Sequence, residues 1–330
     1  MQTNATPAEN IGATPAAPRR SRDWRPLLIY VVFIGLFLLF AITLHERGFL
    51  SENNLMNIAR QSAMIAIMAV GMTFVLSAAE IDLSFGAVVA LSAVTAALLL
   101  PYGVVPAVAG ALAAGAVCGL VNGALVSRIA IPSFLVTLGT AGIITGITRW
   151  ISGLQSIPVD NDVFAFIFGS GDIGPVPVLF LWMVAIVALG HVVLRKSAFG
   201  KAVLASGGNK LAATYAGINV GRVKMWVLLL NALLASLAGI LYAGRLHSAR
   251  YTLGENDLMM VLTAVIIGGT HLFGGKGSVV GALVGALIMG MVNNGLILMG
   301  LDIDQQLILR GVIIICAVTL TSGRLRRPRR

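Results

Sequence analysis

Long apolar runs separated by short polar stretches dominate this chain and predict ten membrane helices. A helix that crosses a hydrocarbon core about 30 Å thick needs roughly 20 apolar residues. Ten segments approach that length: 27–44, 62–79, 85–100, 105–126, 133–149, 177–194, 225–243, 258–270, 278–300 and 307–321. The eighth, with 13 residues, is too short to span unaided. The pattern therefore predicts an all-α polytopic membrane protein with about ten transmembrane helices.

Composition supports a membrane protein and argues against a nucleic-acid partner. Hydrophobic residues make up 58% of the 330, and charged residues only 11%, less than half of the roughly 25% in a soluble domain. The net charge is +10, but the basic residues cluster at the ends of apolar segments, where helix orientation in the bilayer explains them. Cys118 and Cys316 lie inside apolar segments without metal-ligand spacing, so we expect no metal site.

The distribution of charge predicts how the helices are oriented. With ten crossings and a cytosolic N-terminus, 17 of the 23 Lys and Arg residues fall in cytosolic segments, the side that retains short basic loops. Residues 1–26 are rich in Ala, Pro, Thr and Asn and predict a disordered basic cytosolic tail. Residues 322–330 form a second basic cytosolic tail, which leaves 27–321 as one transmembrane domain.

The segment EIDLSFG, residues 80–86, breaks the charge pattern between the second and third helices. Glu80 and Asp82 are two acids without an adjacent base, at a junction expected in the cytosol. Spacing alone slightly favours a short solvated turn. The alternative is a broken helix at membrane depth, where irregular backbone must be buried in protein or line a water-filled path. In that case Glu80, Asp82 and Ser84 belong to a translocation path.

Two other features are typical of transporters. A second interruption, HLFGGKGS at 271–278, follows the short eighth segment, and paired interruptions indicate a transport pathway. The stretches GAVCGLVNG at 115–123 and GALIMGMVNNG at 285–295 are similar and lie five segments apart. Their helices have opposite orientations in the ten-helix arrangement, which suggests a five-plus-five inverted repeat.

These similar stretches carry three amides, Asn122, Asn293 and Asn294. Interhelical hydrogen bonding is the favoured interpretation, because an amide in lipid must find a partner. The alternative is a role in the translocation path, because amides both donate to and accept from hydroxyl groups.

Residues 270–277 do not fit a phosphate-binding loop, although they contain Gly275-Lys276. Thr270 stands where the first glycine belongs, and Gly277 follows the lysine in place of Ser or Thr. The four histidines have no ligand spacing and no nearby nucleophile, so no enzymatic activity is expected. We therefore expect the chain to bind no cofactor itself. If ATP drives transport, another polypeptide must bind it.

The basic insert at 195–224 contains six Lys or Arg and no Asp or Glu, which predicts a cytosolic location. Within it, Asn209 is suited to cap a short helix that ends at Gly217, a favoured left-handed position. Isolated helices of fewer than about 12 residues rarely persist in water. Residues 209–216 are therefore expected to dock against a partner.

Four stretches in the same order resemble the membrane permease subunits of ATP-binding-cassette (ABC) importers for sugars such as ribose, xylose and arabinose. They are IDLSFGAVVALS at 81–92, LVNGALVSRIAIPSFLVTLGT at 120–140, FGKAVLASGGNKLAATYAGINVGRVK at 199–224 and VIIGGTHLFGGKGSVVGALVGALIMGMVNNGLILMG at 265–300. The resemblance covers nearly everything after residue 50. It implies a permease subunit in the bacterial cytoplasmic membrane that translocates a monosaccharide or related polyol.

The resemblance also implies partners and a coupling helix. ATP and Mg are held by separate ATPase subunits, an extracytoplasmic binding protein delivers the sugar, and a second permease copy or a paralogue completes the path. The residues implied to contact the ATPase subunit are Gly207, Gly208, Asn209, Ala212, Ala213, Gly217 and Asn219. Where the family often has acidic residues after the Asn, this chain has Lys210 and Leu211.

Other functions remain open at the level of sequence. Glu80, Asp82 and the inverted repeat are also compatible with an ion-coupled secondary transporter. Within ABC importers, permeases for branched-chain amino acids and nucleosides share parts of the architecture. The sequence identifies neither the sugar nor the pairing of the permease with itself or with a paralogue.

Overall fold

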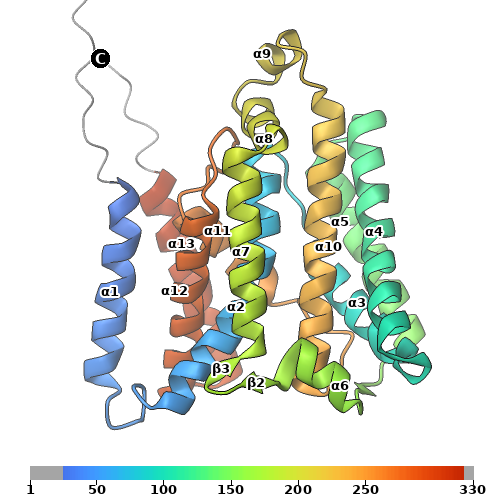
Figure 1. Cartoon of the computed structure of the whole chain (residues 1–330). Helices are drawn as coiled ribbons and strands as arrows, with labels where there is room; N and C mark the ends of the chain where they lie inside the picture. Colours follow the sequence, from blue (N-terminus) through green and yellow to red (C-terminus); the bar gives the residue numbers. More distant parts are fainter. Residues whose placement is uncertain (1–24, 323–330) are drawn as a thin grey trace, which may run out of the picture.

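The computed structural model describes residues 25–322 and shows a bundle of helices (Figure 1). Its first half contains α1 (Arg25–Thr43), α2 (Glu52–Ser77), α3 (Phe85–Leu99), a 3-10 turn η1 (Leu100–Tyr102), α4 (Val104–Arg128) and α5 (Ser133–Ser152). The linking region contains β1 (Ile157–Pro158), α6 (Asp162–Ala165), a π-helical turn η2 (Phe166–Ser170), β2 (Asp172–Ile173) and β3 (Val176–Pro177). The second half contains α7 (Val178–Lys196), α8 (Ala198–Gly208), α9 (Lys210–Tyr215), α10 (Val220–Leu246), β4 (Ser248–Ala249), α11 (Asp257–Ile267), α12 (Val279–Leu298) and α13 (Ile303–Ser322).

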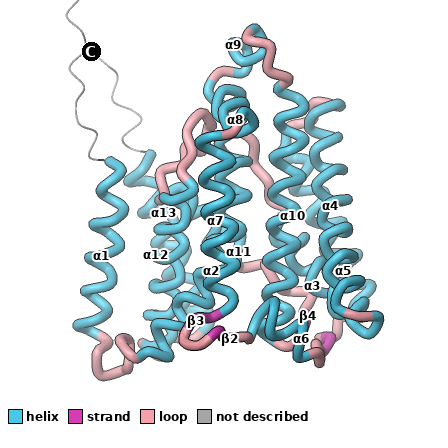
Figure 2. The backbone as a smooth tube through the Cα atoms, viewed as in Figure 1, coloured by secondary structure: helices cyan, strands magenta, loops and turns pink. Residues whose placement is uncertain are grey.

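The all-α fold class is confirmed, because a helix lies at each of the ten predicted segments. Seven helices in the described part of the chain are long and apolar enough to cross a membrane: α2, α3 with η1, α4, α5, α7, α10 and α12. Helices α1 and α11 are apolar over shorter lengths. The strands are two residues long and pair antiparallel, β1 with β4 and β2 with β3, at the end of the bundle opposite α9 (Figure 2).

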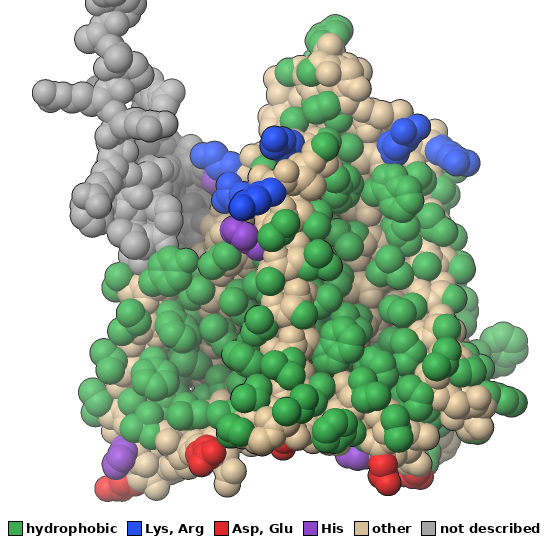
Figure 3. All heavy atoms as spheres, in the orientation of Figure 1, with side chains coloured by type: hydrophobic (Ala, Val, Ile, Leu, Met, Phe, Trp, Pro, Cys, Tyr) green, Lys and Arg blue, Asp and Glu red, His purple; other side chains and the backbone are tan. Residues whose placement is uncertain are grey.

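Charge separates the two ends of the bundle. The described chain ends, Arg25 and Ser322, lie at the same end as α8 and α9 (Figure 1). On the face shown in Figure 3, Lys and Arg side chains gather at that end, Asp and Glu at the other, and hydrophobic side chains cover the surface between them. The predicted tails lie outside the described residues, except for Arg25 and Pro26, which begin α1, and Ser322, which ends α13.

The helix contacts support the predicted inverted repeat. The second apolar segment of each half packs against the fourth segment of the other half: α2 packs against α12, and α10 packs against α4. Helix α4 runs toward the end that carries α9, whereas α12 runs away from it (Figure 1). Glycines make these contacts close: a Cβ on Gly119 of α4 would meet the backbone of Leu229 in α10, and one on Gly290 of α12 would meet the side chain of Ser62 in α2. Such glycine rows let helix backbones approach closely in lipid.

The break between α2 and α3 is buried, so the preference for a solvated turn is wrong. Helix α2 ends at Ser77, Ala79 adopts a left-handed backbone with φ of 60°, and α3 begins only at Phe85. Glu80 is 5% exposed and Asp82 is 1% exposed. The segment 78–84, here called the α2–α3 break, is therefore irregular backbone enclosed by protein.

Irregular backbone flanks α11 on both sides: the predicted interruption at 271–278 follows it, and a second irregular stretch precedes it. The eighth apolar segment is short because α11 begins at the buried Asp257, after the irregular residues 247–256. A Cβ on Gly86, at the start of α3, would meet the carbonyl oxygen of Gly254 in that stretch, so the two interruptions touch. The predicted loop at 271–278 also touches the break, since a Cβ on Gly274 would meet Ala79, and it lies beside α8, where the Gly275 N–H donates to the Ser77 carbonyl at 3.0 Å.

Candidate functional site

A buried hydrogen-bond network surrounds Asp82 in the α2–α3 break. One carboxylate oxygen accepts from Nδ2 of Asn231 in α10 at 2.8 Å. The other accepts from the backbone N–H and the hydroxyl of Ser84, at 2.8 and 2.6 Å. Nδ2 of Asn122 in α4 donates to the Ser84 hydroxyl oxygen at 2.9 Å. Three predicted path residues, Asp82, Ser84 and Asn122, are thus brought together. The sequence analysis missed Asn231, although an amide within the apolar run of α10 could have indicated it.

Two hydroxyl groups of α5 accept hydrogen bonds from backbone N–H groups of the same break. The Ile81 N–H donates to the hydroxyl of Ser133 at 3.1 Å, and the Leu83 N–H donates to the hydroxyl of Thr137 at 3.0 Å. These groups replace the helical hydrogen bonds that an irregular segment loses, which is what makes its burial tolerable. Neither hydroxyl was identified from sequence, because both lie in a different apolar segment.

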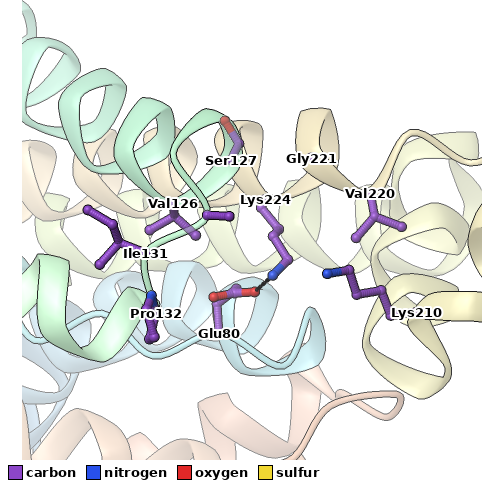
Figure 4. Close-up of a pocket in the computed structure, with 10 residues that line it drawn as sticks. Glu80, Val126, Ser127, Ile131, Pro132, Lys210, Val220, Gly221 and Lys224 are labelled. Atoms are coloured by element: carbon purple, nitrogen blue, oxygen red, sulfur yellow. Dashed lines mark ion pairs between the residues drawn. The ribbon is translucent and has the colours of Figure 1, made fainter.

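Glu80, at the start of the break, forms an ion pair with Lys224 of α10. A buried carboxylate requires such a partner. Beside the pair lies a cavity of about 230 Å³, bounded by the α4–α5 turn, the first residues of α10 and Lys210 of α9 (Figure 4). The cavity therefore joins the α2–α3 break to α9.

The other two predicted path residues lie elsewhere, on α12. Asn294 and Asn54 of α2 exchange hydrogen bonds of 2.7 and 3.1 Å between their amides. Asn293 donates to Oε1 of Gln61 at 3.0 Å and accepts from the guanidinium of Arg310. These are interhelical hydrogen bonds, the favoured interpretation of the two. A role in the translocation path stays a prediction for all of these residues.

The predicted caps of the short helix in the basic insert are confirmed. Oδ1 of Asn209 accepts from the Ala212 N–H at 3.0 Å, which caps the start of α9. At its end Gly217 has φ of +81°, its N–H donates to the Thr214 carbonyl, and the next N–H donates to the Ala213 carbonyl, both at 3.0 Å. This pair of bonds is a Schellman motif, which ends a helix at a left-handed glycine.

The residues implied to contact an ATPase mostly build this unit rather than cover its outer face. Gly207 packs on the end of α2, since a Cβ there would meet the Ser77 carbonyl. Ala213 is buried. Oδ1 of Asn219 accepts from the Arg222 N–H at 2.9 Å and caps α10. Gly208 and Ala212 are exposed.

The outward face of α9 carries two large hydrophobic side chains. Leu211 is 70% exposed and Tyr215 is 89% exposed. They lie four residues apart and hence on one face of the helix, in the part of the chain that projects furthest from the bundle (Figure 1). Sequence reasoning noted Leu211 only as a departure from the family and missed Tyr215, although their spacing was a usable signal.

The loop at 271–278 adds positive charge to the same end of the molecule. Partial burial, and to a lesser degree the charge of Lys276, lower the pKa of His271 below its usual value. The loop therefore contributes the charge of Lys276 to this end, and the lowered pKa of His271 disfavours a second positive charge beside it.

Comparison with known proteins decides the family. Residues 54–318 match the family described as branched-chain amino acid transport system / permease component. The chain belongs to this family. It is 40% identical over 292 residues to the ribose import permease protein of Bacillus subtilis. The alignment covers 87% of this chain and 91% of that protein.

Two further relatives have similar coverage. The D-allose transport system permease protein of Escherichia coli is 36% identical, over 88% of this chain and 90% of that protein. The L-arabinose ABC transporter permease protein of Azospirillum brasilense is 33% identical, over 98% and 96%. No solved structure matches the chain. The α2–α3 break and α9 both lie inside the region matched by the family, so both are parts of a multi-pass membrane permease.

Proposed function

We propose that this chain is the transmembrane permease subunit of an ABC importer that carries a monosaccharide across the bacterial cytoplasmic membrane. The observation that carries the proposal is α9, a short helix capped at both ends that presents Leu211 and Tyr215 to solvent. A helix of six residues is not stable alone in water, and its exposed apolar pair suits a groove on a partner protein. Relatives named for ribose, allose and arabinose support a monosaccharide.

The proposed partner at α9 is an ATPase subunit, which holds ATP and Mg. Its movement reaches the bundle through α8, whose Gly207 contacts Ser77 at the end of α2 and whose Gly208 contacts Gly275. Transport requires two global states that differ in affinity for the sugar or its carrier. The α2–α3 break is the element that changes conformation between these states. It is irregular and polar, and it lines the same cavity as Lys210 of α9.

The proposed orientation puts α8, α9 and both described chain ends in the cytosol. The basic residues at that end support this, since short basic loops stay on the cytoplasmic side. The acidic opposite end then faces the extracytoplasmic binding protein that delivers the sugar.

Acidic residues at the outer end are proposed to attract that carrier. Asp160 and Asp162 are exposed and available, whereas Asp172 accepts two hydrogen bonds from Arg60, at 2.7 and 2.9 Å. Replacing Asp160 and Asp162 by Asn should slow carrier binding and reduce its salt dependence. Unchanged binding at low and high salt would remove these two residues from the proposal.

Reconstitution tests the function. In proteoliposomes, the chain with its ATPase subunit and carrier should import D-ribose, D-allose or L-arabinose only when ATP is supplied. L-Leucine in place of the sugar tests the branched-chain amino acid alternative. Uptake by the chain alone under an ion gradient would contradict the proposal and favour a secondary transporter.

A further inference from the structure

One cation of α9 faces inward, although the apolar pair of this helix faces outward. Lys210 lines the cavity beside Glu80 and Lys224, and its ammonium group points across the cavity toward their ion pair (Figure 4). Within residues 25–322, Lys210 has no carboxylate at ion-pair distance. An unpaired cation on the docking helix thus faces a paired carboxylate on the α2–α3 break.

Among the described residues that line the cavity, these three are the charged ones. The remaining walls are Val126, Ser127, Ala130, Ile131, Pro132, Val220 and Gly221. Glu80 is buried and Lys224 is partly buried, so their charges are screened less by salt than charges on an open surface, whereas Lys210 lies at the exposed rim of the cavity. Glu80 therefore has two competing partners: Lys224, which is fixed to the long helix α10, and Lys210, which is fixed to α9.

We propose that Lys210 is a positioning residue for the α2–α3 break. It competes with Lys224 for Glu80, and displacement of α9 toward the cavity transfers the ion pair from α10 to α9. This inference rests on the proposed function, in which an ATPase subunit moves α9. Glu80 lies two residues before Asp82, which accepts a hydrogen bond from Asn231 of α10. Transfer of the ion pair therefore pulls on Glu80 while Asn231 holds Asp82 in place.

The same geometry accounts for the departure of this chain from the family at position 210. An acidic side chain there would face Glu80 across the cavity and repel it. A lysine in its place attracts Glu80, so the pair Lys210 and Glu80 forms an electrostatic link that belongs to this chain. Leu211, the neighbouring departure, faces outward and leaves the cavity unaffected.

The test measures transport coupling in the complete complex. The permease, its ATPase subunit and its carrier are reconstituted, and D-ribose uptake is divided by ATP hydrolysed. Lys210→Gln should lower this ratio about fivefold, a factor that corresponds to roughly 1 kcal/mol, whereas Lys210→Arg should preserve it. Lys201→Gln is the matched control, because Lys201 is an exposed lysine of α8 that does not line the cavity.

A double-mutant cycle separates this role from a general structural one. Glu80→Gln should lower the ratio by itself, and adding Lys210→Gln should lower it no further, because interacting residues are not additive. Lys210→Glu should reduce the ratio most, and Glu80→Gln in that background should restore part of it. Additive effects, or no rescue, would overturn the inference.

Further outcomes separate failure of this inference from failure of the proposed function. Loss of the ATPase subunit from purified Lys210→Gln would assign Lys210 to the partner interface and contradict a role inside the cavity. If the wild-type complex imports sugar and Lys210→Gln matches it, only this inference fails. If the wild-type complex imports none of the three sugars with ATP, the proposed function fails.

Discussion

The α2–α3 break and α9 are both short segments outside the long membrane helices, but different kinds of interaction hold them in place. Side chains from α4, α5 and α10 form hydrogen bonds to the break, and its polar side chains Glu80, Asp82 and Ser84 are buried. Helix α9 is held by its own terminal caps, and its largest side chains face solvent. The difference separates two kinds of requirement: loss of the Asp82 network should lower the stability of the bundle, whereas loss of the caps or of the outward face of α9 should damage communication with a partner.

The largest expected effect is that of Asp82→Ala in the break. The change leaves buried donors on Asn231 and Ser84 without an acceptor. Leaving these buried hydrogen-bond donors without an acceptor should cost about 3 kcal/mol of stability. Thermal unfolding in detergent measures this loss, with Asp304→Ala on the exposed start of α13 as the control. Equal melting temperatures for the two variants would contradict the assigned role of the network.

Gly217→Val comes next and acts on α9. A β-branched residue at φ of +81° is strained by about 1 to 2 kcal/mol, which removes the Schellman cap. We expect sugar-stimulated ATP hydrolysis to fall about tenfold, with the melting temperature of the bundle unchanged. Gly300→Val is a control, since it places the same strain at φ of +79° at the opposite end. Equal loss of ATP hydrolysis in both would show that the effect is unrelated to α9.

Asn209→Ala removes the other cap of α9 and should have a smaller effect. Loss of a side-chain N-cap costs about 1 kcal/mol, so sugar-stimulated ATP hydrolysis should fall several-fold. Asn209→Ser keeps an N-cap acceptor and should restore most of the activity. Full activity in Asn209→Ala would argue against a requirement for a rigid α9.

The smallest effect is expected at the pair formed by Asn54 and Asn294. Interhelical hydrogen bonds in membranes contribute about 0.6 kcal/mol on average, so replacing both residues by Ala should lower thermal stability only slightly. Sugar uptake should stay near the wild-type level. A large loss of uptake without a loss of stability would instead assign these amides to the translocation path.

Local features of α9 were predictable from sequence, but the surroundings of the break were not. Asn209 and Gly217 determine the ends of a helix between them, so their roles follow from neighbouring residues. The partners of the break lie far along the chain: Ser133 is 52 residues from Ile81, and Asn231 is 149 from Asp82. No local pattern joins them, which is why the solvated turn was slightly favoured.

The interruption before α11 was missed for a related reason. Sequence length showed that the eighth apolar segment was short and that an interruption follows it, but not that an irregular stretch also precedes it. Gly254 meets Gly86 only after both halves of the bundle have packed together. The ten helices were predictable because each depends on its own apolar length. The missing information was in contacts between the halves.

The most direct test of the account is the affinity of the reconstituted permease for its ATPase subunit after Leu211→Ala and Tyr215→Ala are combined. Exposed apolar residues that anchor an interface each contribute more than about 1 kcal/mol, so the dissociation constant should rise at least about tenfold. The melting temperature of the permease should not change. Unchanged affinity for the ATPase subunit would contradict the assignment of α9 as the docking helix.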